Sequence, residues 1–267
     1  MRKVCNTKRI GHAGTLDPLA TGLLVVAVGP ATRFLQYLDL EPKVYEATVK
    51  FGVETTTQDR EGDIVAELPT PTDLASVLEV TLTQFRGLID QVPSIYSAVK
   101  KDGQPLYKYA RQGIEVEVRP RRVHIAKLEV TAWVASDEAI LSVECSGGTY
   151  VRTLAHDIGE ALGCGAHLSA LRRTKVGKFP LSDSKPLDEV RPFDIIPLSQ
   201  ALIPPSESAT LDEGQIRDIR MGRAIDFEAE YGEGPVVLID EAENVVGIAK
   251  YRCNQLHPEC VIPAPMP

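Results

Sequence analysis

The stretch that most constrains the fold reads Gly11-His12-Ala13-Gly14-Thr15-Leu16-Asp17-Pro18-Leu19-Ala20-Thr21-Gly22. Its glycines and proline precede an apolar run at residues 23–28, which predicts a loop that leads into a buried strand. Loops on rigid scaffolds often carry functional residues. The segment lacks the Gly-Lys-Ser/Thr ending of a phosphate-binding P-loop and the second histidine of a His-x-Gly-His motif. On residue types alone, an ordinary turn in which Asp17 bonds nearby backbone amides is the favoured interpretation.

Apolar spacing along the rest of the main segment indicates a mixture of strands and helices. Alternation at residues 43–51 places Tyr45 on the apolar face of a strand, and residues 123–134 and 139–145 predict a β-hairpin. Helical spacing occurs at residues 74–85 and again at residues 151–162. Because strands and helices do not alternate regularly, we expect the α+β class.

Two shifts in composition, at residues 179–186 and 203–208, suggest boundaries between domains. We therefore expect a main domain at residues 1–203 and a small domain at residues 207–267. The small domain offers a short helix at residues 211–220 and two strands at residues 236–239 and 245–251.

Composition predicts a globular protein. The chain has 267 residues, of which 43% are hydrophobic and 25% charged, and no apolar run approaches the roughly 18 residues of a membrane span. This excludes a membrane-spanning or disordered protein. The N-terminal residues lack the apolar core of a signal peptide, so we expect a cytoplasmic protein. Its five scattered cysteines do not suggest disulfides.

The formal net charge of -8 at first argues against a nucleic-acid partner, but the charge is unevenly distributed. Residues 182–267 carry 7 basic and 16 acidic side chains, which leaves 22 basic and 21 acidic ones in residues 1–181. Basic side chains gather at residues 100–127 and 172–178. Such clusters are usually solvated faces, although they could also bind a polyanion.

Two other groups of polar residues do not predict sites. Cys253, His257 and Cys260 provide only three ligands without a second Cys-x-x-Cys pair, so we expect no zinc there. Asp157 and Glu160 lie at helical spacing, and we interpret them as solvated charges. We therefore expect no metal site.

The segment at residues 11–22 resembles the hallmark motif of the bacterial TruB-type tRNA pseudouridine synthases, which modify the T-arm uridine at tRNA position 55. Further family motifs follow in order across residues 8–200, while the tail from about Leu211 resembles the small PUA-like domain of many members. These motifs are Lys43-Val44-Tyr45-Glu46-Ala47, Phe85-Arg86-Gly87, Gln91-Val92-Pro93-Ser94-Ile95-Tyr96-Ser97-Ala98-Val99-Lys100, Leu106-Tyr107-Lys108-Tyr109-Ala110-Arg111-Gln112-Gly113, Gly148-Thr149-Tyr150-Val151-Arg152 and Leu171-Arg172-Arg173.

The resemblance implies a mixed, mostly antiparallel central sheet flanked by helices and an isomerase that needs no cofactor. It also implies that Asp17 is the catalytic nucleophile. A carboxylate in a pocket that encloses a base is costly to ionise without a fixed cation, and Arg152 in the first turn of its helix is the candidate. Tyr45 suits stacking on the uracil ring, and its hydroxyl could take part in proton removal.

The resemblance further implies that His12 and Tyr150 contact the flipped nucleotide. Leu171 would form an apolar wall of the pocket, although a leucine in an amphipathic helix is usually a core residue. The basic clusters would become contacts to the phosphates of the folded T-arm. The residues that we expect there are Lys100, Arg121, Arg122, Arg172 and Arg173.

Two other functions are considered as alternatives to this interpretation. A catalytically idle RNA-binding protein on the same scaffold would be expected to have lost Asp17, Tyr45 or Arg152, and all three are present. A guide-RNA particle is disfavoured by the lack of long basic extensions, so we expect a monomer that acts on tRNA without a guide.

The N-terminus departs from the family. Members begin with a strand carrying a Lys-Pro motif and a helix, whereas residues 1–10 resemble only the end of that helix. We therefore expect the chain to be truncated relative to the family, and a version extended upstream to be more stable.

Overall fold

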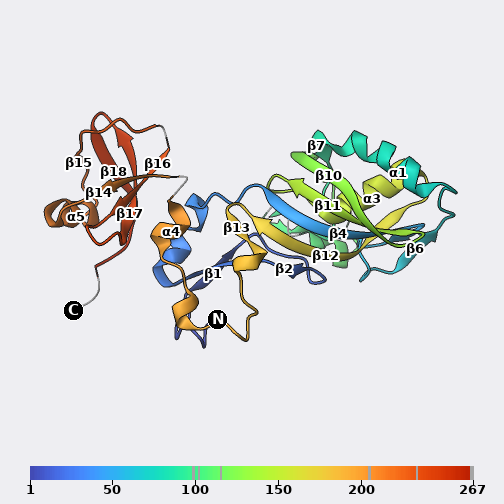
Figure 1. Ribbon diagram of the computed structural model, residues 1–267, viewed down its shortest axis with the longest axis horizontal. Coiled ribbons are helices and arrows are strands. Elements are labelled where there is room, and N and C mark those ends of the chain that lie inside the picture. Colours follow the sequence, from blue (N-terminus) through green and yellow to red (C-terminus); the bar gives the residue numbers. More distant parts are fainter. Residues whose placement is uncertain (98–99, 102, 115, 204–205, 233, 265–267) are drawn as a thin grey trace. The chain divides into compact units, whose positions relative to one another are not determined.

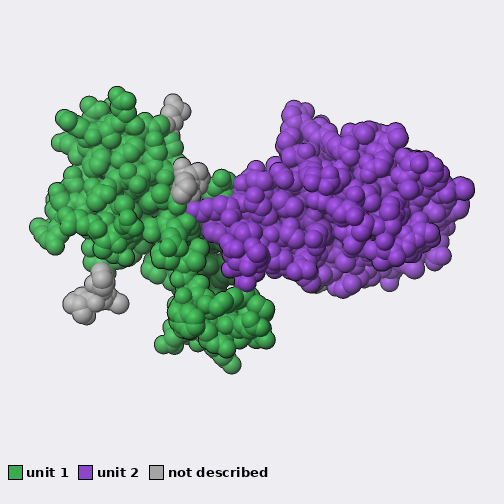
Figure 2. Space-filling view, in the orientation of Figure 1, with its two compact units in different colours: residues 1–15, 24–39, 185–267 green, residues 16–23, 40–184 purple. Residues whose placement is uncertain are grey.

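The computed structural model describes residues 1–97, 100–101, 103–114, 116–203, 206–232 and 234–264. The chain divides into two compact units, which Figure 2 colours purple and green. The first, the sheet unit, comprises residues 16–23 and 40–184. The second, the tail unit, comprises residues 1–15, 24–39 and 185–267. The loop that carries Asp17 thus belongs to the sheet unit, while the segments before and after it belong to the tail unit.

A seven-stranded sheet forms the frame of the sheet unit (Figure 1). All its pairings are antiparallel except that of β2 with β12. This confirms the expected α+β class with a mixed, mostly antiparallel sheet. The strands lie in the order β13 (Phe179–Pro180), β12 (Ala166–Val176), β4 (Lys43–Phe51), β11 (Glu138–Cys145), β10 (Arg121–Ala135) and β7 (Gly87–Gln91), with β2 (Thr21–Gly22) beside β12.

The core of this unit lies where β4 meets two helices. As the alternation predicts, β4 buries Tyr45 and every second residue after it. Helices α1 (Leu74–Leu82) and α3 (Val151–Leu162) contribute leucines to the same core, and Gly163 ends α3 in the left-handed conformation. The expected helix at residues 74–85 is α1 plus the short 3-10 helix η3 (Thr83–Phe85), and its Val77 is exposed rather than buried.

Smaller elements complete the sheet unit. The hairpin that the sequence predicts is formed by β10 and β11. The others are β5 (Val53–Thr55) and β6 (Ile64–Glu67), β8 (Lys100–Lys101) and β9 (Gln104–Pro105), α2 (Leu106–Arg111) and η4 (Leu181–Asp183).

The expectation of one buried strand at residues 23–28 is wrong. Leu23 is buried in the sheet unit, where its N–H donates a 2.8 Å hydrogen bond to the Arg173 carbonyl of β12. Only β3 (Val25–Val28) is a strand; it is half-buried and pairs with β1 (Ile10–Ala13) in the tail unit. The bonds to β12 therefore divide the apolar run between the two units.

The tail unit contains a five-stranded sheet with its own core. The predicted helix and two strands are present, whereas β14, β15 and β18 are not predicted by the spacing of apolar residues. The elements are β14 (Glu207–Thr210), α5 (Glu213–Arg220), β15 (Ile225–Asp226), β16 (Pro235–Ile239), β17 (Val245–Arg252) and β18 (Gln255–Val261).

A second core in the tail unit joins Phe34 and Leu202 to residues of β16, β17 and β18. The expected division at residues 203–207 therefore describes the small sheet but not the whole compact unit. The remaining elements are η1 (Gly29–Arg33), η2 (Leu35–Tyr37), η5 (Pro192–Asp194) and α4 (Leu198–Leu202). Residues 2–6 form turns, not the end of a helix.

No helix in the described ranges has both the length and the apolar character that a bilayer span requires.

The close approach of β2 to β12 gives a stability prediction at Gly22. Its φ of +93° disfavours other residues, and a Cβ there would lie 2.2 Å from the Arg173 carbonyl oxygen. Gly87 has a similar φ of +87° but no atom within 4 Å of the added Cβ, so Gly87→Ala measures the backbone strain alone. We expect Gly87→Ala to lower the free energy of unfolding by about 1–2 kcal/mol and Gly22→Ala by clearly more, as measured by urea denaturation. Equal losses would show that the contact with β12 adds nothing.

Candidate active site

Arg152 is the centre of the site. It lies in the first turn of α3 and is buried, with 5% of its surface exposed. A cation near a helix N-terminus is unfavourable because the helix dipole is positive there, so a buried arginine in that position requires anionic partners. The structure supplies two of them.

The first partner is Asp17, as the sequence analysis expects. Arg152 Nε lies 2.8 Å from Asp17 Oδ2, and Nη2 donates a hydrogen bond of 3.2 Å to Oδ1. The Asp17 side chain is 32% exposed, so part of it is open to solvent although both carboxylate oxygens contact Arg152. This geometry holds an oxygen in a fixed direction, which a nucleophile requires.

The second partner is Asp59, which no residue pattern or motif predicts. Arg152 Nη1 donates to Asp59 Oδ2 at 2.9 Å, and the Asp59 side chain is only 4% exposed. Thr57 helps to hold it, since its hydroxyl donates to Asp59 Oδ1 at 2.6 Å and its carbonyl accepts from Arg152 Nη1 at 3.2 Å. The only local signal was an aspartate after three threonines, which is typical of an ordinary turn.

Burial is the main influence on the pKa of Asp17. Desolvation raises the pKa of its carboxyl above the usual 3.8, against the Coulombic effect of Arg152, while the charge of Asp59 raises it further. Arg152 therefore pairs with two carboxylates, and its charge only partly offsets the effect of desolvation on the pKa of Asp17. The carboxylate is consequently more basic than a solvated aspartate.

A buried glutamine fixes the start of α3. Gln91, at the end of β7, accepts from the Tyr150 N–H at 2.8 Å and donates to the Tyr150 carbonyl at 3.0 Å. Tyr150 is the N-cap residue of α3 and has no cap from its own side chain. Gln91 thus orients both the half-buried Tyr150 and the turn that carries Arg152.

Tyr45 and Leu171 lie on neighbouring strands of the sheet unit. Tyr45 is 7% exposed, and burial raises the pKa of its phenol, with the Coulombic effect of Asp17 among the smaller causes. Leu171 is buried on β12, opposite Ala47 of β4. The expectation that Leu171 lies on an amphipathic helix is wrong, because residues 166–176 form a strand that pairs with β4 along its length.

His12 is assigned to the other compact unit of the chain. It is exposed on β1, in the tail unit, whereas Asp17, Tyr45, Tyr150, Arg152 and Leu171 all belong to the sheet unit. Contact of His12 with the substrate stays a prediction.

The expected RNA contacts differ in exposure. Arg121 and Arg122 of β10 and Arg172 of β12 are exposed, although Arg122 lies 3.4 Å from Asp90 in an ion pair. Arg173 is buried, with 1% of its surface exposed, and its Nε donates to the Leu23 carbonyl at 2.9 Å. Arg173 is therefore corrected from a phosphate contact to an interior residue. The side chain of Lys100 lies outside the described part of the chain.

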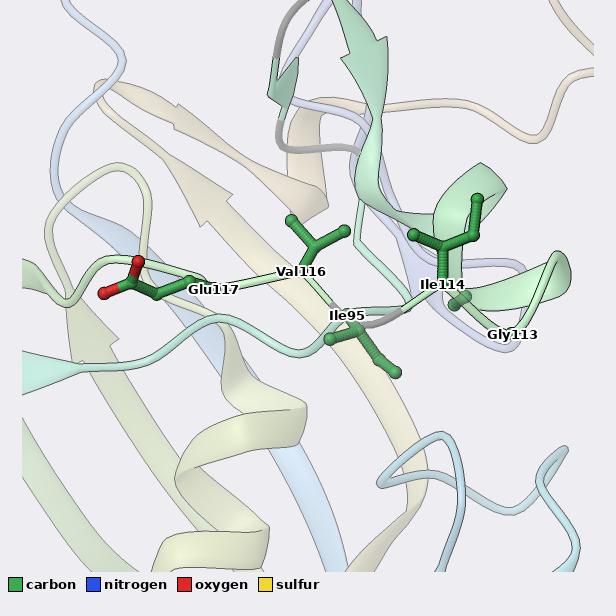
Figure 3. A pocket seen from close by; sticks show the side chains of 6 residues that line it. Ile95, Gly113, Ile114, Val116 and Glu117 are labelled. Atoms are coloured by element: carbon green, nitrogen blue, oxygen red, sulfur yellow. The ribbon is translucent and has the colours of Figure 1, made fainter.

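A hollow of about 700 Å³ lies beside the segment that joins β7 to β10 (Figure 3). Its lining residues are Ile95, Ala110, Gly113, Ile114, Val116 and Glu117, and none of them belongs to the expected site.

Asp157, which we expected to be solvated, is half-buried, and burial raises the pKa of its carboxyl to about 6. Its neighbour Glu160 is exposed, as expected.

Comparison with known proteins identifies the family. Residues 2–151 match the N-terminal domain of the TruB family of pseudouridylate synthases, and residues 152–208 match the tRNA pseudouridylate synthase B C-terminal domain. The chain belongs to the TruB family. This confirms the family that the motifs predict, and the TruB N-terminal match contains both Asp17 and Tyr45.

Individual relatives agree with the family match. A tRNA pseudouridine synthase B of Chromobacterium violaceum is 44% identical over 267 residues, which cover 96% of this chain and 86% of the relative. One of Azoarcus is 42% identical over 267 residues, covering 98% and 88%. Among solved structures, a chain of a Cbf5-Nop10-Gar1 complex has a TM-score of 0.68 at 24% identity, covering 98% of this chain and 79% of that one, which supports the TruB-type fold.

The raised pKa of Asp17 gives a prediction about stability. A carboxyl with a raised folded-state pKa makes the protein less stable as pH rises through that pKa, since the folded form then loses a proton it holds more tightly than the unfolded chain. We expect Asp17→Asn to unfold at pH 7 at a temperature equal to or above that of the wild type. The difference should shrink as the pH approaches 4. A large loss of stability at pH 7 would contradict this.

Asp59→Asn is the matched control, because it removes the deeply buried partner of the same arginine. It should destabilise the protein by about 3–5 kcal/mol in urea denaturation, as for other broken buried ion pairs.

Proposed function

We propose that this chain is a tRNA pseudouridine synthase that isomerises a uridine in the T-arm loop, at tRNA position 55. The observation that carries the proposal is the pairing of the partly exposed Asp17 with the buried Arg152 in a chain of the TruB family. The names of its relatives, tRNA pseudouridine synthase B, support tRNA as the substrate.

The reaction breaks the bond between N1 of uracil and C1′ of the ribose and forms a bond between C5 and C1′. The proton on C5 is lost and N1 gains one, so the atoms balance without oxidation or a transferred group. Asp17 is the proposed nucleophile; Arg152 contacts both of its carboxylate oxygens and orients them, while 32% of the Asp17 side chain stays exposed. The chemistry itself requires neither a metal nor a cofactor.

Tyr45, Tyr150, Leu171 and His12 are the proposed substrate-binding residues. A base stacked in a stem-loop must leave the stack before Asp17 can reach its ribose, so the uridine is expected to flip. Tyr45 offers a ring for stacking on the uracil, Leu171 an apolar wall, and Tyr150 and His12 contacts to the flipped nucleotide. Burial, and to a smaller extent the charges of Cys145 and Asp17, raise the pKa of the Tyr45 phenol, and the proposal gives its hydroxyl a part in proton removal.

Exposed arginines provide the proposed surface for the RNA backbone. Arg121 and Arg122 are exposed on β10, and Arg172 is exposed on β12. Lys100 is proposed as a further contact to the RNA backbone. The enzyme would work as a monomer in the cytoplasm and find its target through the shape of the tRNA, without a guide RNA.

Substitution of Asp17 tests the catalytic role. Asp17→Asn should bind tRNA normally but lower the rate by roughly a thousandfold or more, because the amide is a poor nucleophile. Arg152→Lys should also be severe, since an ammonium group cannot pair with two carboxylates as a planar guanidinium does. Pseudouridine in an unmodified tRNA transcript is measured by mass spectrometry after single-turnover incubation. Wild-type protein that binds tRNA but forms no pseudouridine would instead support an idle RNA-binding protein.

The salt dependence of binding tests the proposed RNA surface. Tight tRNA binding should weaken steeply with salt despite the net charge of -8, because local clusters make the contacts. Neutralising Arg121, Arg122 and Arg172 together should flatten the plot of log affinity against log salt by about one unit per lost phosphate contact. An unchanged slope would exclude this surface.

A further inference from the structure

The burial of Arg173 distinguishes it from its neighbours on β12. Arg172 and Lys175 are exposed on the same strand, whereas Arg173 is among the largest fully buried side chains, with 1% of its surface exposed. Burying a guanidinium is costly unless its donors are paired. Its partners therefore indicate what it does.

One partner is the end of the loop that carries Asp17. The Leu23 N–H donates to the Arg173 carbonyl at 2.8 Å, and Arg173 Nε donates to the Leu23 carbonyl at 2.9 Å. Thr21 adds a bond of 3.3 Å from its hydroxyl to the Leu171 carbonyl. The backbone and the side chain of Arg173 thus hold both polar groups of one residue, Leu23, six positions after Asp17.

The other partner is Tyr45. Arg173 and Tyr45 are paired residues on adjacent strands, and the guanidinium hydrogen-bonds the Tyr45 hydroxyl. Burial is the main cause that raises the pKa of this phenol, and the charges of Cys145 and Asp17 raise it further, whereas the hydrogen bond and the charge of Arg173 lower it. Arg173 therefore joins the two groups that the proposed reaction would use, the Tyr45 hydroxyl and the loop of Asp17.

We propose that Arg173 is a positioning residue that fixes the Tyr45 hydroxyl and the Asp17 loop in one arrangement. The proposal rests on the proposed function, because it gives Tyr45 and Asp17 their roles. It predicts that Arg173 acts on the reaction step and not on the affinity for tRNA.

Kinetics of paired variants on β12 test this. Arg173→Lys and Arg173→Gln should lower kcat by about 10- to 100-fold with little change in KM, since small displacements of reacting groups cost that much. Arg172→Gln, one residue away and exposed, should show the opposite pattern, with its loss in KM and a flatter salt dependence. A loss confined to KM in the Arg173 variants would overturn the proposal. Thermal unfolding is measured first, and if Arg173→Gln does not fold, Arg173→Lys carries the comparison.

A double-mutant cycle with Tyr45→Phe tests the link to the hydroxyl. If Arg173 acts through that group, Arg173→Lys should lower kcat much less in the Tyr45→Phe protein than in the wild type. Equal losses in the two backgrounds would show that the hydrogen bond does not matter for the reaction.

Hydrogen exchange tests the hold on the loop independently of activity. Peptides that cover residues 16–23 should exchange faster in Arg173→Lys than in the wild type or Arg172→Gln. If the wild type forms no pseudouridine, the proposed function fails while this measurement still stands. If the wild type is active but the loop exchanges equally in all three proteins, the role of Arg173 in holding the loop fails alone.

Discussion

The buried guanidinium of Arg152 is the interaction on which the rest of the site depends. It lies at the positive end of α3 and contacts Asp17 and Asp59 within 3 Å. If neither carboxylate were present, the arginine would be an uncompensated buried charge. If the arginine were absent, the two carboxylates would repel each other. The arrangement therefore requires three segments far apart in the sequence to fold together: the loop before β2, the turn after β5 and the first turn of α3.

Each of these segments is also held by hydrogen bonds to groups other than Arg152. Gln91 holds the backbone of Tyr150 at the start of α3, and Thr57 holds Asp59. Arg173 and Thr21 attach the loop of Asp17 to β12. A network of this kind limits how far the carboxylate of Asp17 can move, which is what a positioned nucleophile requires.

Residue patterns predicted the parts of the fold that depend on local periodicity. The alternation of β4, the β10–β11 hairpin and the extent of α3 follow from the spacing of apolar residues, and the motifs pointed to Asp17 and Arg152, which the structure pairs. Other features depend on contacts between distant strands. Nothing in Leu171-Arg172-Arg173 itself shows that the segment is a strand, nor which arginine points inward, because β4 and β2 determine both.

Asp59 was missed for the same reason. A threonine-rich turn ending in aspartate is common on protein surfaces, and only its approach to Arg152 gives it a different meaning. The division of residues 23–28 between two units was also invisible locally, since it follows from the bonds of Leu23 to β12.

The division of the chain has a mechanical consequence for the loop. Residues 16–23 belong to the sheet unit, but the covalent chain leaves for the tail unit at both ends of this short segment. Tension in either connection would reach Asp17 within a few peptide bonds if the segment were free. At its C-terminal end, the bonds at Thr21 and Leu23 transfer such a load to β12 before it reaches the carboxylate, and the ion pair with Arg152 restrains the carboxylate itself.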